Sequence, residues 1–267
     1  MPLAICATPI GNLEDVTLRV LRELAEADLV LCEDTRRTRI LLDRHEVSAR
    51  LLSYHEHNEA ARTAEVLPKL VAGARVALVT DAGLPGISDP GARLIAAAIE
   101  AAVPVTVLPG ASAVETALVA SGFEAARYQF LGYLPRREAA LRALWDELRD
   151  WPWPAVAFES PRRLPGALRS LAGVQPDRPV AVCRELTKQF EEVVRGPASA
   201  VAARFVEPPK GEITLVLGPG EGGVEGEGQA VAAVAELVAA GVSRRHAANL
   251  VARLTGTRPN TLYRGSL

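Results

Sequence analysis

Aromatic side chains are scarce in this chain: phenylalanine, tyrosine and tryptophan together make up only 4% of its 267 residues. Hydrophobic residues nevertheless account for 49% of the sequence. We therefore expect a core built mainly from alanine, leucine and valine. The length allows one or two domains with an appendage.

Cysteine and long apolar runs are also lacking. Cys6, Cys32 and Cys183 lie far apart, each within a short apolar run. This spacing argues against a disulfide or zinc framework and predicts buried free thiols in a reducing compartment. No apolar run approaches the roughly 20 residues of a membrane span, and no basic segment typical of a secretory signal begins the sequence. We expect a soluble, cytoplasmic protein.

Neither sign of charge is in excess, because 30 Lys and Arg face 32 Asp and Glu, for a net charge of −2. This balance excludes a globally basic nucleic-acid coat but allows local basic patches. Arginine greatly outnumbers lysine. Its forked guanidinium suits phosphate and carboxylate partners.

The most informative segment that is present is 76–91. An apolar run over 76–80 predicts a buried strand, which ends at Asp81. The following loop holds three glycines and two prolines, which allow close backbone approach to a ligand and fix the path of the chain. Ligands of open α/β sheets bind at the carboxyl ends of strands. The segment is either such a ligand loop or a tight turn whose aspartate caps a helix.

The pattern of this segment recurs along the first half of the chain. Strands are predicted at 3–8, 29–34, 51–55 and 105–108, alternating with helices, and polar or Gly/Pro-rich residues follow each of them. This alternation predicts a mostly parallel sheet with a site along one edge.

The second half predicts a separate mixed sheet. We assign residues 1–121 to an N-terminal α/β domain, 122–218 to a mixed α/β domain and 219–229 to a Gly/Glu-rich linker. The linker region contains a G-x-G-x-x-G pattern, which we reject as a dinucleotide site because no helix is predicted to open within it and glutamates would repel a pyrophosphate. Residues 230–267 predict a helix-turn-helix-like unit. Five arginines make this unit basic: Arg244, Arg245, Arg253, Arg258 and Arg264. It is either a nucleic-acid contact or a packing appendage.

Two polar clusters follow strands of the first domain. Glu33 and Asp34 precede three arginines within residues 36–39, as in either a self-neutralising surface turn or a carboxylate base beside a phosphate clamp. Residues 55–59 contain two histidines, but their spacing matches no standard metal site and we expect no metal. A substrate-contacting loop or a solvated turn is the better interpretation.

Five motifs in order carry a resemblance: TPIGNL at 8–13, EDTR at 33–36, SYHEHN at 53–58, the segment 80–91 and LPGAS at 108–112. Together they resemble the tetrapyrrole-methylase-like superfamily of S-adenosylmethionine (SAM) methyltransferases, and more narrowly its small-subunit ribosomal RNA branch. The resemblance covers nearly the whole chain, including the helical appendage. The first loop, TPIGN, lacks the G-x-G form of the tetrapyrrole enzymes and fits the RNA branch.

This resemblance implies a two-domain, class III SAM methyltransferase α/β fold with a helix-turn-helix-like appendage, with SAM folded between the domains of a homodimer. It implies 2′-O-methylation of a cytidine in 16S ribosomal RNA near the decoding centre, with the small ribosomal subunit as partner. The implied SAM contacts are Pro9, Gly11, Asp81, Ala82, Gly83, Ile87, Ser88, Gly110, Ala111, Ser112, Leu131, Gly132, Glu185, Leu186, Ile213 and Thr214.

The acceptor hydroxyl must lose a proton during methyl transfer, and the sequence offers several bases. The candidates are Glu33, Asp34, His55 and Glu59, among which the sequence does not choose. RNA phosphates would be held by Arg36, Arg37, Arg39, Arg136, Arg137, Arg162, Arg163, Arg244 and Arg245. Two alternatives remain open: a methyltransferase acting on a small tetrapyrrole, and a non-catalytic nucleic-acid-binding protein.

Overall fold

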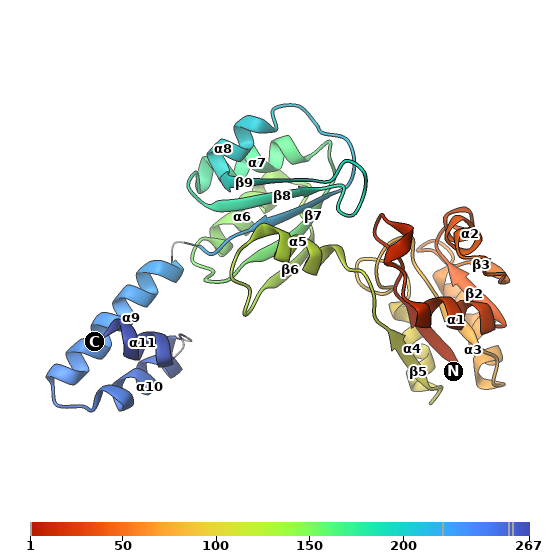
Figure 1. Cartoon of the computed structure of the whole chain (residues 1–267), viewed down its shortest axis with the longest axis horizontal. Coiled ribbons are helices and arrows are strands. Elements are labelled where there is room, and N and C mark those ends of the chain that lie inside the picture. The colour runs from red at the N-terminus through yellow and green to blue at the C-terminus, as the bar shows by residue number, and fades with distance from the viewer. Residues whose placement is uncertain (1, 221, 256, 258) are drawn as a thin grey trace. The chain divides into compact units, whose positions relative to one another are not determined.

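The computed structural model describes residues 2–220, 222–255, 257 and 259–267, with backbone alone for 222–228. The chain forms two compact units (Figure 1). Unit 1 comprises Met1–Ala117 together with Arg184–Glu192, and unit 2 comprises Leu118–Cys183 together with Val193–Leu267. The segment 184–192 therefore belongs with the first unit, although sequence order assigned it to the second domain. None of the described helices is long and apolar enough to span a membrane.

Unit 1 is built on the predicted parallel sheet. Its strands, in the spatial order β3-β2-β4-β1-β5, are β1 (Leu3–Cys6), β2 (Leu29–Cys32), β3 (Leu51–Ser53), β4 (Val76–Leu78) and β5 (Val105–Leu108). All four neighbouring pairs run parallel. Every strand except β5 ends two residues before the end of its predicted range. The last residues of those ranges belong to the polar loops that follow the strands.

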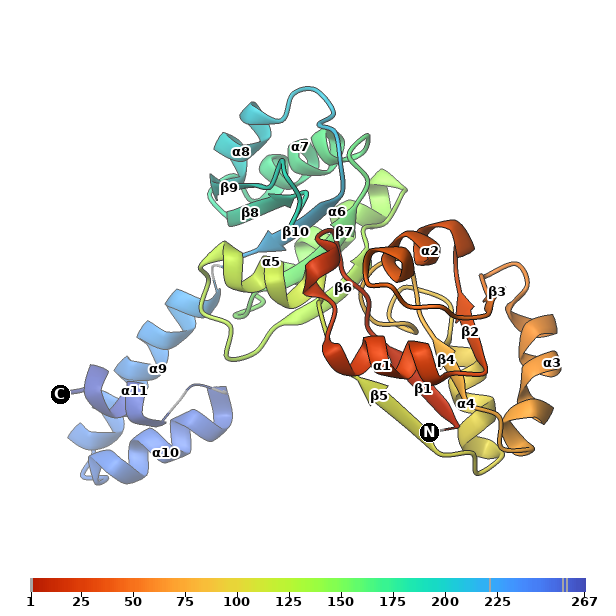
Figure 2. The same ribbon diagram turned by 45° about the vertical axis from the view of Figure 1, so that its right-hand side comes forward.

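Helices cover both faces of this sheet, as a fully buried parallel sheet requires. Alternate strand residues point to opposite faces. Ala4 and Cys6 pack with α1 (Leu18–Glu26) and α2 (Thr35–Arg44). Leu3 and Ile5 pack with α3 (Glu59–Val71) and α4 (Ala92–Glu100) on the other face. A short 3₁₀ helix, η1 (Leu13–Asp15), precedes α1. Figure 2 shows α1, α2, α3 and α4 around the sheet.

Unit 2 contains the predicted mixed sheet, in the order β6-β7-β10-β8-β9. The strands are β6 (Gln129–Tyr133), β7 (Ala155–Glu159), β8 (Pro179–Arg184), β9 (Glu192–Pro197) and β10 (Ile213–Leu217). β6 runs parallel to β7, and β10 runs antiparallel to β7. Its main core joins this sheet to α6 (Glu138–Leu148), α7 (Leu164–Val174) and α8 (Ala198–Arg204), through side chains such as Trp145, Leu168 and Val201. Helix α5 (Ala113–Ser121) spans the boundary of the two units.

Three C-terminal helices pack against one another: α9 (Gly222–Ala239), α10 (Arg244–Thr255) and α11 (Pro259–Gly265) (Figures 1 and 2). Val234, Ala247 and Leu262 are fully buried in their shared apolar core. Helix α9 opens at Gly222, inside the stretch predicted as a linker. The expectation that no helix opens within the G-x-G-x-x-G stretch is therefore wrong.

Candidate functional site

Three loops meet at the carboxyl ends of β4, β1 and β5, because β1 lies between the other two strands. Thr8 and Gly83 exchange two backbone hydrogen bonds of 2.8 and 3.0 Å, and the Thr8 hydroxyl donates to the Thr80 carbonyl at 3.0 Å. On the other side, a Cβ added to Gly110 would lie 2.9 Å from the Cβ of Ala7. The sheet thus brings together the predicted cofactor residues Pro9, Gly11, Asp81, Ala82, Gly83, Gly110, Ala111 and Ser112.

The loop after β4 is held in an unusual backbone conformation. Gly83 and Gly86 have φ values of 80° and 85°, which glycine adopts without steric cost. Ser88 has a φ of 61° although it carries a side chain, and the neighbouring Ile87 is 51% exposed. Left-handed non-glycine residues are costly and cluster at ligand sites, so this loop has the geometry expected of a binding segment.

Gly11 lies against the segment 184–192, which unit 1 recruits from far along the chain. The Asn12 amide donates to the Thr187 hydroxyl at 3.0 Å. A Cβ on Gly11 would lie 2.8 Å from the Leu186 carbonyl oxygen and 2.7 Å from the Thr187 hydroxyl oxygen. Glu185 and Thr187 themselves have φ values of 52° and 66°. The predicted cofactor residues Glu185 and Leu186 therefore sit beside the first loop, within unit 1.

We expect Gly11→Ala to lower the free energy of unfolding by about 1–3 kcal/mol, because the new methyl group must push the backbone at Leu186 away. Gly166→Ala is the matched control: it lies on α7, and nothing is within 4 Å of its added Cβ. That control should leave stability unchanged or raise it by about 0.5–1 kcal/mol. Urea unfolding of both variants checks this, and equal effects would contradict the tight contact.

Asp81 is fixed by groups from α2. The Asp34 amide donates to Asp81 Oδ1 at 3.1 Å, and Arg37 Nη1 lies 3.3 Å from Asp81 Oδ2. Burial raises the pKa of Asp81, the Asp34 amide bond lowers it, and the charge of Glu33 raises it further. A carboxylate whose pKa is raised by burial and by neighbouring charge is typical of a functional position rather than a stabilising one.

Two of the four candidate bases have structural roles. Asp34 caps α2 by accepting from the Arg36 amide at 2.8 Å and pairs with the Arg36 guanidinium, which together lower the pKa of Asp34 to about 2. Glu59 Oε1 accepts from the Tyr54 hydroxyl and from the amides of Gly91 and Arg93 at 3.1–3.3 Å, so it caps α4. Neither carboxylate is suited to accept a proton from a substrate.

His55 is held within its own turn. Its amide donates to Asn58 Oδ1 at 2.8 Å, and its ring Nε2 lies 3.1 Å from Asn58 Nδ2. Ring Nδ1 is buried and has no hydrogen-bond partner among the described residues. The His57 ring centroid is 5.9 Å away. In the described parts of the chain no group of three His, Cys, Asp or Glu side chains is arranged to hold a metal ion.

Glu33, the remaining candidate, shares Thr80 with a carboxylate that the sequence analysis missed. The Thr80 hydroxyl donates its one proton to Glu33 Oε2 at 3.1 Å, and Asp89 lies within hydrogen-bonding reach of the same hydroxyl oxygen. Burial, reinforced by the charge of Glu33, raises the pKa of Asp89 to about 6. Asp89 stands before Pro90 in a turn-rich segment, which gave no reason to separate it from an ordinary turn aspartate. Only the folded loop returns it to the end of β4.

Asp89 should make stability depend on pH. Its pKa is higher in the folded protein than the ordinary value of 3.8, so the folded state holds the proton more tightly. Its contribution to stability is present at low pH and is lost as pH rises through about 6. We expect Asp89→Asn to raise the unfolding temperature relative to the parent protein more at about pH 7.5 than at about pH 4.5. A gain independent of pH would contradict this.

The predicted RNA-binding arginines differ in their exposure to solvent and in their ion pairs with carboxylates. Arg36 and Arg37 are paired with Asp34 and Asp81, although both stay exposed. The prediction that Arg163 binds RNA needs correction. Arg163 pairs with the buried Glu159 at 3.0 Å and donates to two backbone carbonyls, so it has a structural role and is not available to a phosphate. Arg244 is half-buried. The remaining members, Arg39, Arg136, Arg137, Arg162 and Arg245, are exposed.

The cofactor residues predicted in unit 2 lie on both faces of its sheet. Ile213 is 4% exposed and packs in the core beneath the helices, so its side chain is not available to a ligand. Thr214 pairs with Phe158 across β10 and β7 and points to the opposite face. Gly132 has a φ of 66° with open space around it, and Leu131 packs against the core.

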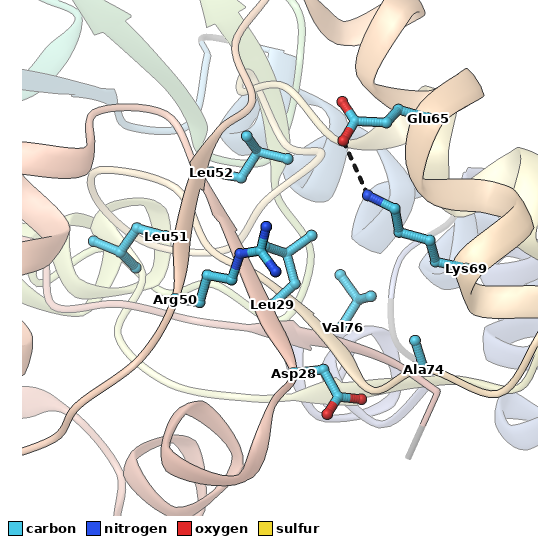
Figure 3. A pocket seen from close by; sticks show the side chains of 9 residues that line it. All are labelled: Asp28, Leu29, Arg50, Leu51, Leu52, Glu65, Lys69, Ala74 and Val76. Atoms are coloured by element: carbon cyan, nitrogen blue, oxygen red, sulfur yellow. Dashed lines mark hydrogen bonds and ion pairs between the residues drawn. The ribbon is translucent and has the colours of Figure 1, made fainter.

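A separate pocket of about 230 Å³ lies at the other end of the unit 1 sheet (Figure 3). Leu29, Leu51 and Val76, the first residues of β2, β3 and β4, line it. Its charged groups serve the fold: Glu65 pairs with Lys69 at 3.0 Å, and Asp28 accepts from the Arg75 amide at 2.8 Å. None of the residues that line this pocket belongs to the loops after β1, β4 and β5.

Comparison with known proteins shows the family of this chain. A model of the tetrapyrrole (corrin/porphyrin) methylases matches residues 2–202. The chain belongs to the tetrapyrrole methylase family. Two curated relatives are both named ribosomal RNA small subunit methyltransferase I. The protein from Mesorhizobium japonicum is 40% identical over 98% of this chain and 90% of its own length. That from Thermotoga maritima is 44% identical over 80% of this chain and 97% of its own.

Solved structures show the same tetrapyrrole methylase fold at low identity. Uroporphyrin-III-C-methyltransferase from Thermus thermophilus matches with a TM-score of 0.57 and 22% identity, covering 84% of this chain and 97% of that one. A structure of a Thermus thermophilus uroporphyrin-III C-methyltransferase complexed with S-adenosylhomocysteine matches with a TM-score of 0.57 and 18% identity over 81% of this chain and 96% of that one.

Proposed function

We propose that this protein is a SAM-dependent methyltransferase that modifies the ribose 2′-hydroxyl of a cytidine in 16S ribosomal RNA near the decoding centre. The observation that carries the proposal is the 40% identity to a small-subunit rRNA methyltransferase over 98% of the chain, which includes the three C-terminal helices. The exposed arginines support it, because a nucleic-acid substrate is held through its phosphates.

The loop residues of unit 1 fit the chemistry of SAM. Its ribose hydroxyls suit a carboxylate, and Asp81 is held at the end of β4 by the Asp34 amide and by Arg37. Its amino-acid end needs backbone donors and acceptors, which the loops containing Gly83 and Gly110 supply. When bound, SAM supplies an already activated methyl group. Leu131, Gly132 and Thr214 remain proposed contacts of unit 2.

The chain must then orient the acceptor hydroxyl and take up its proton. We assign the proton to the pair Glu33 and Asp89, which flank the Thr80 hydroxyl. A carboxylate whose pKa is raised to about 6 is a better base than an ordinary aspartate and is still deprotonated at neutral pH. Positioning by the loops supplies the rest of the rate enhancement.

We also propose that the protein works as a homodimer in the cytoplasm, on the assembled or assembling small subunit. The rRNA substrate supports this location, and the family resemblance supports the dimer. Helices α9–α11 are proposed as an additional RNA contact through Arg244 and Arg245. They form a core of their own and carry one exposed arginine at the start of α10.

A transfer assay tests the proposed function. The protein is incubated with SAM labelled at its methyl group and with either small ribosomal subunits lacking the modification or uroporphyrinogen III. We expect label in the RNA fraction alone. Label in the tetrapyrrole alone would establish the competing small-molecule activity, and retention of RNA without any transfer, while SAM is not bound, would establish a non-catalytic binding protein.

The exposed arginines beside β6 and β7 should contribute phosphate contacts. Replacing Arg136, Arg137 and Arg162 with glutamine should weaken RNA binding and lower the salt dependence by roughly one phosphate contact for each lost arginine. SAM affinity should not change. Filter binding at several salt concentrations measures how steeply RNA affinity falls with salt. An unchanged salt dependence would show that these arginines do not contact RNA phosphates.

A further inference from the structure

Tyr133 presents an aromatic ring to solvent at the end of β6, an edge strand. Its side chain is 63% exposed, in a chain that contains only four tyrosines. An exposed ring at this position needs an explanation, because it buries little apolar area in the fold.

A β-bulge directs this side chain. Phe130 pairs with Val156 and Tyr133 pairs with Phe158, so three steps along β6 match two steps along β7. Gly132 absorbs the extra residue with a φ of 66°, and nothing lies within 4 Å of a Cβ built on it. The left-handed backbone, not lack of space, therefore favours glycine here. Bulges of this kind re-aim a side chain and are common next to functional sites.

The Tyr133 ring packs against Phe158. Phe158 makes edge-to-face contacts with Phe130 at 5.0 Å and with Tyr133 at 5.6 Å between ring centroids. These contacts fix the orientation of the Tyr133 ring, since such pairs have a preferred geometry. Phe158 also pairs with Thr214, a proposed SAM contact, on the sheet face opposite to the helices. The tyrosine thus forms a rigid platform beside proposed cofactor residues.

Exposed arginines lie on the loop that follows Tyr133 and on the turn beside that loop. Arg136 and Arg137 follow Tyr133 in the chain and are exposed. Arg163 donates to the carbonyls of Leu134 and Pro135 at 2.9 and 2.7 Å, which places the turn carrying exposed Arg162 beside the same loop. The nearby carboxylates are compensated, because Glu159 pairs with Arg163 and Glu138 pairs with Arg142.

We propose that Tyr133 stacks on a nucleobase of the RNA substrate and so positions the nucleotide that receives the methyl group. This inference rests on the proposed function. An aromatic ring among arginines suits single-stranded RNA, whose bases stack on aromatic side chains while arginines hold the phosphates. We favour a nucleobase of RNA over a second protein as the partner of this surface, because its arginines complement the negative charge of a polyanion.

Binding to an rRNA fragment that contains the modified region tests the inference. Tyr133→Ala and Tyr133→Leu should weaken binding roughly 5- to 150-fold, the range for losing one stacked base. Tyr133→Phe and Tyr133→Trp should retain it, since both keep an aromatic face. The salt dependence should stay the same in all four, because no phosphate contact is lost. Tyr128 is another exposed tyrosine and lies just before the first residue of β6, so Tyr128→Ala is the matched control and should bind normally.

The outcomes separate the two proposals. If the parent protein methylates the RNA but Tyr133→Leu, folded by its thermal transition, binds and reacts as well as the parent, the stacking role is overturned and the methyltransferase proposal stands. If Tyr133→Phe is as weak as Tyr133→Leu, the hydroxyl matters and stacking is again overturned. A parent protein that binds unmodified small ribosomal subunits together with SAM but transfers no methyl group to their RNA overturns the proposed function, whatever the Tyr133 variants do.

Discussion

Asp81→Ala should weaken SAM binding roughly ten- to 150-fold while leaving the protein folded. The loss of one charge-assisted hydrogen bond costs about 1.5–3 kcal/mol, which gives this range of affinity. The fold should tolerate the change because burial and the charge of Glu33 raise the pKa of Asp81, so its charge does not stabilise the native state. Isothermal calorimetry with purified protein measures the affinity.

Two further variants make this test specific. Asp81→Asn can still accept the Asp34 amide bond, so any loss of SAM affinity it shows reports the missing charge alone. Asp43 is an exposed residue on α2, the helix whose first residues hold Asp81, and Asp43→Ala should bind SAM normally. Unchanged affinity in a folded Asp81→Ala protein would show that Asp81 only anchors α2.

Arg163→Ala should lower the free energy of unfolding by about 3 kcal/mol, the low end of the range for breaking a buried ion pair, because Arg163 itself is partly exposed. The side chain of Glu159 has no exposure to solvent. Burial already raises the pKa of Glu159, and the Ser160 amide and Arg163 oppose that shift. Without Arg163 the pKa should rise further, so the destabilisation should be larger at about pH 8 than at about pH 5.

Arg162→Ala is the control for this prediction. The two arginines are adjacent, but Arg162 is exposed and takes part in none of the contacts that hold Glu159. It should unfold as the parent protein does in urea and lose RNA affinity instead. Equal stability of the two variants would show that the ion pair of Arg163 with Glu159 does not stabilise the fold. Arg163 would then again be a candidate RNA contact.

The strand pattern of the first domain could be predicted because its sheet is buried on both faces. Such strands appear as continuous apolar runs, and the polar loops after them mark the carboxyl edge. The meeting of the loops that contain Pro9, Asp81 and Gly110 follows from that topology. The structure adds the contacts between them, such as the paired backbone bonds of Thr8 and Gly83.

Other features depend on contacts between residues far apart in the chain, which a sequence does not show. Glu59 caps a helix that starts 33 residues later, so it resembled a free carboxylate. The pKa of Asp89 is raised only when the folded loop buries it and brings it near the charge of Glu33. Arg163 and Arg162 carry the same charge, and only the buried Glu159 distinguishes them. The segment 184–192 joins unit 1 against the order of the sequence.

The most direct test of the proposed function is nucleoside mass spectrometry of 16S ribosomal RNA after incubation of unmodified small subunits with the purified protein and SAM. We predict one new 2′-O-methylcytidine per RNA molecule near the decoding centre, and much less of it with the Asp81→Ala protein at limiting SAM. Methylation on a base, or no methylated nucleoside in an RNA that the protein demonstrably binds together with SAM, would contradict the assignment of a ribose 2′-O-methyltransferase.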